Sequence, residues 1–196
     1  MSWQDRCERA ATALLLQSPI TALATEPKKL ETGRRILFDS WAGYCARTGQ
    51  SRYALTEGGP LPDGCTLRIE DLYLVLTDDT GAAGARRRRF TQAHELGHIL
   101  LEHETDGPQQ EREADRFASA LLLPAPALCE FWRQGSRPAA GQLADWFFVS
   151  ISAARTRLAQ LTAQGSCRWG EAEQALARRY APLVAAALAD RHTVTV

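Results

Sequence analysis

The chain has 196 residues, of which 45% are hydrophobic and 23% charged, and its formal net charge is zero. This composition is typical of one globular domain with a hydrophobic core, or of one domain with an appended segment. Zero net charge excludes a bulk attraction to nucleic acid or to an anionic membrane surface. No run reaches the roughly 18 apolar residues of a membrane span, so we expect a soluble protein without a membrane partner.

The cysteines are scattered and form no Cys-x-x-Cys pair, which argues against a structural zinc knuckle or a redox pair. Free thiols in a reducing compartment are therefore expected, which predicts a cytoplasmic protein. The five residues are Cys7, Cys45, Cys65, Cys129 and Cys167.

The first part of the chain carries helix and strand patterns but no recognisable site. Residues 3–16 and 28–47 predict amphipathic helices, and residues 48–64 are rich in Gly and Pro and predict irregular structure. Residues 69–77 predict a strand. Its central part, Leu72–Leu76, is a candidate for pairing with an extended substrate, although an interior strand with both edges occupied fits equally well. The second helix is expected to bury Leu30, Ile36, Leu37, Trp41 and Tyr44.

The motif His94-Glu95-x-x-His98 has the spacing that two zinc-binding histidines need on a helix. Residues four apart share a helix face, so both imidazoles can bind one ion at about 2.0–2.1 Å. Glu95 projects about 100° further round and can act on a water without being a ligand. Gly97 is unfavourable in a helix by about 1 kcal/mol relative to alanine, so we infer that another backbone passes close to it. The alternative is a surface helix with two ordinary histidines, and a third ligand decides between them.

A downstream helical run, Glu111–Leu123, supplies that third ligand. On a helical wheel the apolar residues fill one arc, which contains Glu111 and has Asp115 at its edge. Glu113 falls outside this arc, on the polar side with two arginines. A carboxylate on an apolar face is unfavourable unless it is paired or bound to metal, so the phase predicts Glu111 as the ligand. Asp115 is then placed to accept the ring N–H of a liganding histidine, unless both acids simply favour a helix start.

Together these two stretches resemble a known family. They resemble motifs of the ImmA/IrrE family of zinc metallopeptidases. The two stretches are Phe90-Thr-x-Ala-His-Glu-Leu-Gly-His-Ile-Leu-Leu and, further along, Glu-x-Glu-Ala-Asp-x-Phe-Ala-x-x-Leu-Leu-x-Pro. The resemblance is tight from about Arg86 to Pro124. It implies a cytoplasmic endopeptidase of mobile elements or stress circuits that cleaves a helix-turn-helix repressor. Its zinc ligands would be His94, His98 and Glu111, with Glu95 as the catalytic base.

Two features near the motif are interpreted as lying outside the site. Arg86–Arg89 follow a Gly81–Gly84 loop, and no aromatic residues interleave with them for base stacking, so we interpret them as solvated loop charge. His103 lies just past the zinc helix between two glutamates, and we interpret it as solvent-exposed.

The remainder of the chain predicts a helical extension. A Gly/Pro linker at Gln134–Pro138 precedes residues 142–161, which resemble a helix-turn-helix pair in which Arg155, Thr156 and Arg157 would face DNA. Because the chain has no net positive charge, we favour two short helices packed on the protease body, and we do not expect direct nucleic-acid binding. Glu171–Ala189 predicts a last amphipathic helix, which offers a surface for a partner or a dimer.

The sequence as a whole predicts an α+β fold that is mostly helical and zincin-like. A metallopeptidase domain at 1–134 would hold a small twisted sheet beside the zinc helix (about 91–102) and the third-ligand helix (about 111–123). Residues 135–196 would form the C-terminal helical region. The predicted function is zinc-dependent cleavage of a protein substrate. The alternative is a zinc-binding transcriptional regulator that cleaves nothing, but a sensor has no use for Glu95.

Overall fold

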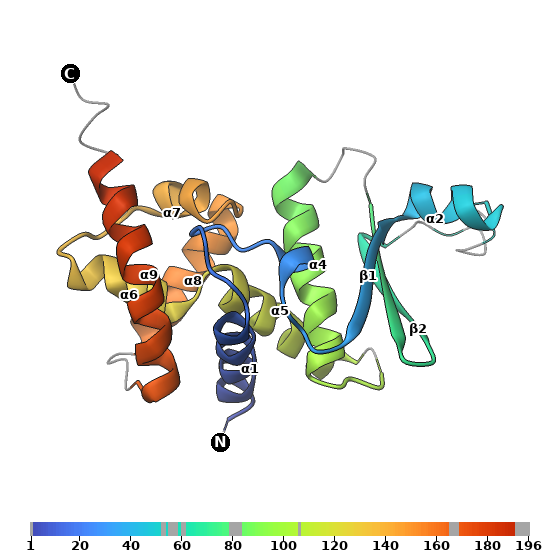
Figure 1. Cartoon of the computed structure of the whole chain (residues 1–196), viewed down its shortest axis with the longest axis horizontal. Helices are drawn as coiled ribbons and strands as arrows, with labels where there is room; N and C mark the ends of the chain where they lie inside the picture. Colours follow the sequence, from blue (N-terminus) through green and yellow to red (C-terminus); the bar gives the residue numbers. More distant parts are fainter. Residues whose placement is uncertain are drawn as a thin grey trace.

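The structure, a computed structural model, describes residues 2–51, 54, 59, 62–78, 84–105, 107–164 and 169–190. Within these ranges the chain is mostly helical with a small sheet, which confirms the predicted α+β class. Figure 1 shows the sheet at one end of the molecule, α4 and α5 beside it, and the C-terminal helices at the other end. None of the helices in the described ranges combines the length and apolar character that a bilayer crossing requires.

The first helix, α1 (Trp3–Gln17), confirms the helix predicted at 3–16. The Ser2 hydroxyl accepts a hydrogen bond from the Asp5 amide at 3.1 Å, and the Asp5 carboxylate accepts one from the Ser2 amide at 3.2 Å. This reciprocal pair satisfies two amides at the helix start. The helix ends at Gln17, because Ser18, directly before a proline, has an extended backbone. One face of α1 is buried in the core through Cys7, Ala11, Leu14 and Leu15.

The second predicted helix, over 28–47, is wrong in its central part. Residues 35–40 form strand β1 (Arg35–Ser40), and the α-helix begins only afterwards as α2 (Trp41–Thr48). Ser40 separates the two elements, because its hydroxyl accepts a hydrogen bond from the Gly43 amide and so begins the helix. Leu37, expected to be buried, is 56% exposed, since neighbouring strand residues point to opposite faces.

The sheet has the strand order β1-β3-β2, where β2 is Gly64–Ile69 and β3 is Leu72–Thr77. β1 pairs with β3 in parallel and β2 pairs with β3 antiparallel. The strand predicted at 69–77 is β3, which begins only at Leu72. Ile69 is the last residue of β2, and the turn between the two strands contains Glu70, with a φ of 55°. β3 lies between the other two, so the interior alternative is correct and Leu72–Leu76 has no edge to offer a substrate.

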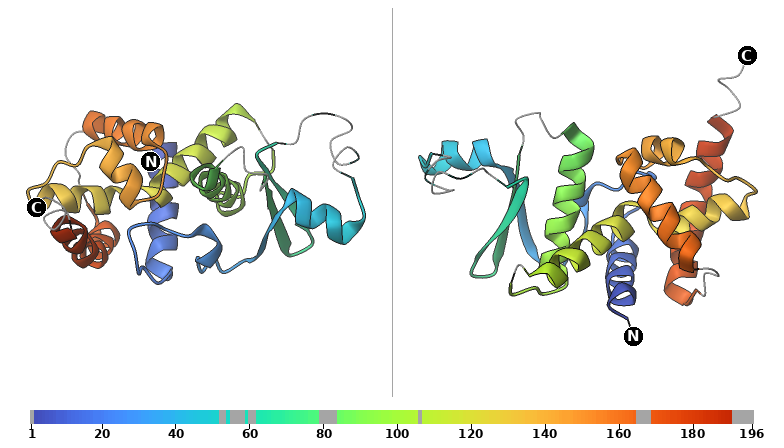
Figure 2. Two further views of the ribbon diagram at one scale, coloured as in Figure 1. Left: turned by 90° about the horizontal axis from the view of Figure 1, so that it is seen from above. Right: turned by 180° about the vertical axis from the view of Figure 1, so that it is seen from behind.

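Helices α4 (Gly84–Leu100) and α5 (Pro108–Leu122) form the centre of the molecule. Figure 2 shows α4 between the sheet and the remaining helices, and α5 crosses it closely. A Cβ added at Gly97 would lie 3.0 Å from the Cα of Ala114 on α5. This confirms the inference that another backbone passes close to Gly97, and it fixes how near the two helices lie.

The arginines at 86–89 belong to the first turns of α4 rather than to a loop. Arg89 is buried, and its guanidinium donates hydrogen bonds to the carbonyls of Thr25, Phe147 and Phe148. Thr25 lies just before the 3-10 helix η1 (Pro27–Lys29). The interpretation as solvated loop charge is therefore wrong for Arg89, which ties α4 to two distant segments.

The C-terminal helices are α6 (Ala125–Arg133), α7 (Ala140–Trp146), α8 (Ile151–Gln164) and α9 (Glu171–Asp190). Arg157 on α8 is fully buried, donates to both carboxylate oxygens of Glu8 at 2.5 and 2.8 Å, and donates to the Leu123 carbonyl at 2.9 Å. A DNA-facing role is therefore wrong for Arg157. Arg157 joins α8 to α1, and the packing of the whole C-terminal region on the protease body stays a prediction.

One cluster of buried hydrophobic residues runs through both predicted parts of the chain. It includes Leu14, Leu96, Phe117, Phe131, Phe147 and Tyr180, from α1 through α9. The predicted division at residue 134 stays a prediction.

Candidate metal centre

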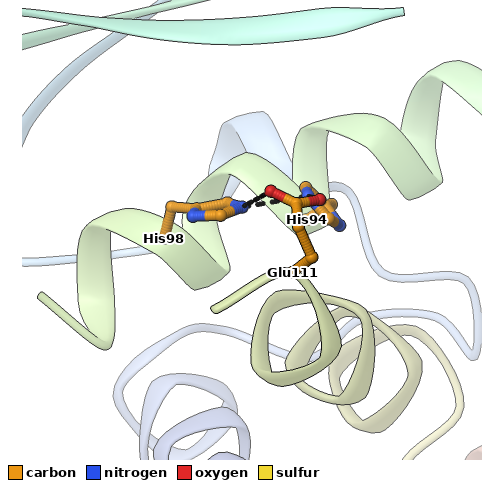
Figure 3. Close-up of side chains that lie close together, drawn as sticks. All are labelled: His94, His98 and Glu111. Atoms are coloured by element: carbon orange, nitrogen blue, oxygen red, sulfur yellow. Dashed lines mark hydrogen bonds and ion pairs between the residues drawn. The ribbon is translucent and has the colours of Figure 1, made fainter. Parts of the chain in front are cut away.

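Three predicted ligands meet where α4 crosses the start of α5. His94 and His98 lie one turn apart on α4, and Glu111 lies in the first turn of α5, with its carboxylate directed at both rings (Figure 3). The Nε2 atoms of the two histidines are 3.0 Å apart, and each lies 3.4 Å from a Glu111 oxygen. One ligand atom from each residue falls within 4.8 Å of the others.

These separations fit a zinc ion. Four ligands at about 2.0–2.1 Å in a tetrahedron lie about 3.3 Å from one another. The two Nε2 atoms are 3.0 Å apart and each faces its own Glu111 oxygen at 3.4 Å, so the three side chains lie close enough to share one ion. Two imidazole nitrogens and one carboxylate oxygen also form a donor set that catalytic zinc takes, with one position left for water or substrate. The Glu111 side chain is 49% exposed, so that position is accessible from solvent.

The helical-phase argument that selected Glu111 is wrong, although the residue it selected lies in the centre. Glu113 is buried, with a side chain only 10% exposed, whereas Glu111 is the exposed acid. The reason is that α5 packs against α1 as well as against α4, so its buried arc is wider than the apolar pattern. On the α1 side this arc contains polar residues, among them Glu113 and Arg116, which face Arg6 and Glu8.

Asp115 lies where the sequence placed it, beside a histidine of the centre. The Nδ1 atom of His94 is 2.9 Å from an Asp115 oxygen, so the ring donates there and turns Nε2 toward Glu111. Burial on its own lowers the pKa of His94. The hydrogen bond to Asp115 and the charges of Asp115, Glu95 and Glu111 outweigh burial and raise that pKa above its ordinary value.

Glu95, the predicted base, is buried between α4 and the sheet. The hydroxyl of Thr66 on β2 donates to the Glu95 carboxylate at 2.7 Å. The β2 backbone also passes close, because a Cβ at Gly64 would lie 3.3 Å from the other carboxylate oxygen. Sequence reasoning missed Thr66, and nothing in the local pattern of residues 64–69 marks it, because only the packing of β2 on α4 brings it to Glu95.

The interpretation of His103 as solvent-exposed is also wrong. Its side chain is 5% exposed, its Nδ1 lies 3.2 Å from Nδ1 of His98, and its Nε2 lies 3.2 Å from a Glu113 oxygen. The chain reverses directly before it, at Glu102, which has a φ of 57°. This left-handed residue folds His103 back beneath the end of α4, and no helical spacing could have predicted it.

Two hollows lie near the three donors. One of about 530 Å³ is lined by His98 and His103 together with Arg68 and Tyr73 of the sheet. The other, about 780 Å³, lies beyond Asp115 between α1, α4, α5 and α8. The first hollow therefore gives the centre open space beside His98.

The segment that carries this centre matches a known protein family. Residues 82–159 match the family described as Peptidase_M78, IrrE N-terminal-like domain. This segment is similar to an IrrE N-terminal-like domain. The resemblance to the ImmA/IrrE family is thereby confirmed, and the M78 family supports a peptidase function of the metallopeptidase type. The domain contains all three donors, Glu95 and His103, whereas the sheet that carries Thr66 lies before it. No curated protein matched the chain.

Proposed function

We propose that the chain is a zinc-dependent endopeptidase that uses a metal-activated water to cleave a protein substrate. The observation that carries this proposal is that His94 and His98, on the helix that also carries Glu95, converge with Glu111 of α5, so that one ligand atom from each lies within 4.8 Å of the others. The peptidase family of residues 82–159 supports the same class of reaction. The position of this helix beside a small sheet supports a zincin-like fold.

A zinc ion in this centre would polarise the scissile carbonyl and lower the pKa of a coordinated water toward about 7. Glu95 acts as the general base, taking a proton from the attacking water and later giving it to the leaving amine. Thr66 keeps the Glu95 carboxylate in one orientation through its hydrogen bond. Asp115 holds the ring of His94 with Nε2 toward the other donors.

An extended substrate is proposed to pair with β2 rather than with β3. Among the described strands, β2 is paired on one side only, whereas β3 is paired on both. β2 also touches Glu95 through Thr66, so a peptide beside this strand lies close to the base. Backbone hydrogen bonds to an edge strand bind an extended chain without demanding a sequence.

The proposed substrate is a helix-turn-helix transcriptional repressor, cut in the cytoplasm as part of a mobile-element or stress-response circuit. The resemblance to the ImmA/IrrE family supports this partner. Cys7, Cys45, Cys65 and Cys129 form no disulfide, which agrees with a reducing compartment. Direct binding of nucleic acid is not part of the proposal, since the chain has no net charge and Arg157 is buried.

Metal content tests the centre itself. Purified protein should contain one zinc per chain by elemental analysis. Glu111→Gln should lose zinc to a competing chelator more readily than wild type. Glu70→Gln, which changes an exposed acid at the far turn of the sheet, is the matched control and should retain it. Fresh wild-type protein without stoichiometric metal would contradict the proposal.

Cleavage separates the enzyme from a regulator that only binds zinc. Glu95→Gln keeps the ligands and removes the base, so it should bind zinc and capture the repressor uncut from cell extract. Wild-type protein should then cut the captured partner at one place, and a chelator should stop the cut. The rate should fall by about 10²–10⁴-fold in Glu95→Gln. Wild-type protein that binds the partner with zinc present and leaves it intact would favour the regulator.

A further inference from the structure

A chain of polar side chains leads from the metal centre to α1. His98 Nδ1 lies 3.2 Å from His103 Nδ1, and His103 Nε2 lies 3.2 Å from a Glu113 oxygen. The other Glu113 oxygen accepts a hydrogen bond from the Gln109 side chain at 2.8 Å. Arg6 of α1 lies 3.7 Å from the Glu113 carboxylate. This chain contains none of the three proposed ligands except His98.

We propose that His103 is a positioning residue that holds His98 in the tautomer with its hydrogen on Nδ1, which leaves the Nε2 lone pair free for the metal. Glu113 anchors His103 in turn. This inference rests on the proposed function, because it assigns His98 as a ligand. The family match assigns no role to His103 or Glu113.

The direction of the hydrogen bonds follows from Glu113. A carboxylate only accepts, so His103 carries its hydrogen on Nε2 and donates it to Glu113. A neutral His103 then has a lone pair on Nδ1, which accepts the Nδ1–H of His98. The reverse arrangement puts two lone pairs, those of His103 and Glu113, against each other. In that arrangement His98 carries its hydrogen on Nε2 and can donate it to the Nε2 lone pair of His94 at 3.0 Å, in the place of the metal. A hydrogen bond to the Glu113 carboxylate is stronger than one between two neutral imidazoles, so the first arrangement is favoured, with the two Nε2 lone pairs facing each other where the metal would bind.

Burial makes this arrangement effective. The side chains of His103 and Glu113 are 5% and 10% exposed, so water cannot readily replace either partner. The backbone holds His103 as well, because its amide donates to the His98 carbonyl at 3.0 Å. His94 has a different support, since its Nδ1 donates to Asp115, whose side chain is 61% exposed. His103, which supports His98, is therefore more deeply buried than Asp115, which supports His94.

The experiment compares two substitutions at His103. His103→Leu keeps an apolar volume and removes the acceptor, whereas His103→Asn retains an acceptor close to the position of Nδ1. Glu104→Gln, which alters the exposed neighbouring acid, is the control. Zinc dissociation constants are measured by chelator competition. The His98 tautomer is read by long-range proton–nitrogen NMR of the metal-free protein at about pH 8, above the ordinary histidine pKa of about 6.5.

Wild type, His103→Asn and Glu104→Gln should show the hydrogen of His98 on Nδ1. His103→Leu should lose this tautomer and bind zinc about 10–100-fold more weakly, the usual effect of removing a partner of a liganding histidine. The proposal is overturned if His103→Leu keeps both the tautomer and wild-type affinity, or if His103→Asn is as impaired as His103→Leu. If wild-type protein binds no zinc, the proposed function fails, while the tautomer in metal-free protein still decides the role of His103.

Discussion

Replacing Gly97 by alanine should separate α4 from α5 and weaken the metal centre. The added Cβ would lie 3.0 Å from the Cα of Ala114 and 3.2 Å from a ring carbon of Phe117. Carbon atoms in good contact are about 3.5–4.0 Å apart, so α5 must recede by about 0.5–1 Å. Glu111 lies one turn before Ala114 on α5, and His98 directly follows Gly97 on α4. A shift of this size exceeds the tolerance of about 0.2 Å for metal–ligand distances.

Two measurements follow from this geometry. Overpacking costs about 1–3 kcal/mol, and the better helix propensity of alanine offsets about 1 kcal/mol. We therefore expect the free energy of unfolding in urea to fall by up to about 2 kcal/mol. Zinc affinity in a chelator competition should fall by about tenfold or more, comparable with the loss of a residue that supports a ligand.

Gly141→Ala is the matched control. Within the described residues, a Cβ at Gly141, in α7, meets no atom within 4 Å. This variant should gain about 0.4–1 kcal/mol of stability and keep its zinc affinity. The reasoning is refuted if Gly97→Ala binds zinc as tightly as wild type, because the close helix contact would then not set the position of Glu111.

Three further predictions concern buried polar groups. Thr66→Val should leave zinc affinity unchanged and lower the cleavage rate of the captured substrate by about 10–150-fold. A hydrogen bond to a charged group such as Glu95 contributes about 1.5–3 kcal/mol, and about 1.36 kcal/mol is tenfold in rate. An unchanged rate would exclude Thr66 as the support of Glu95. Glu8→Gln leaves the buried guanidinium of Arg157 without its carboxylate, and urea unfolding should show a loss of about 3 kcal/mol. Burial raises the pKa of the Cys7 thiol to about 11, so in the folded protein at pH 8 it should stay protonated and resist a thiol reagent that labels it after unfolding.

The part of the centre that one helix carries could be predicted from the sequence. The spacing of His94 and His98 needs only the geometry of a single α-helix, and the close approach at Gly97 follows from the unfavourable place of glycine in a helix. The partner of His94 was also predictable, because Asp115 lies one turn after Glu111 on the neighbouring helix. These residues interact within one helix or across one tight helix pair, so local periodicity contains the information.

The tertiary structure decided the rest. Periodicity predicted that Glu113 faces solvent, because a helical wheel assumes one buried face, whereas α5 packs against both α4 and α1. His103 reaches His98 only because Glu102 reverses the chain, and Thr66 reaches Glu95 only because β2 packs on α4. Each of these contacts depends on where a second element lies. The free energy of burying a polar group depends on the hydrogen-bonding or charged partner that a second element supplies. The local sequence around the group does not identify that partner.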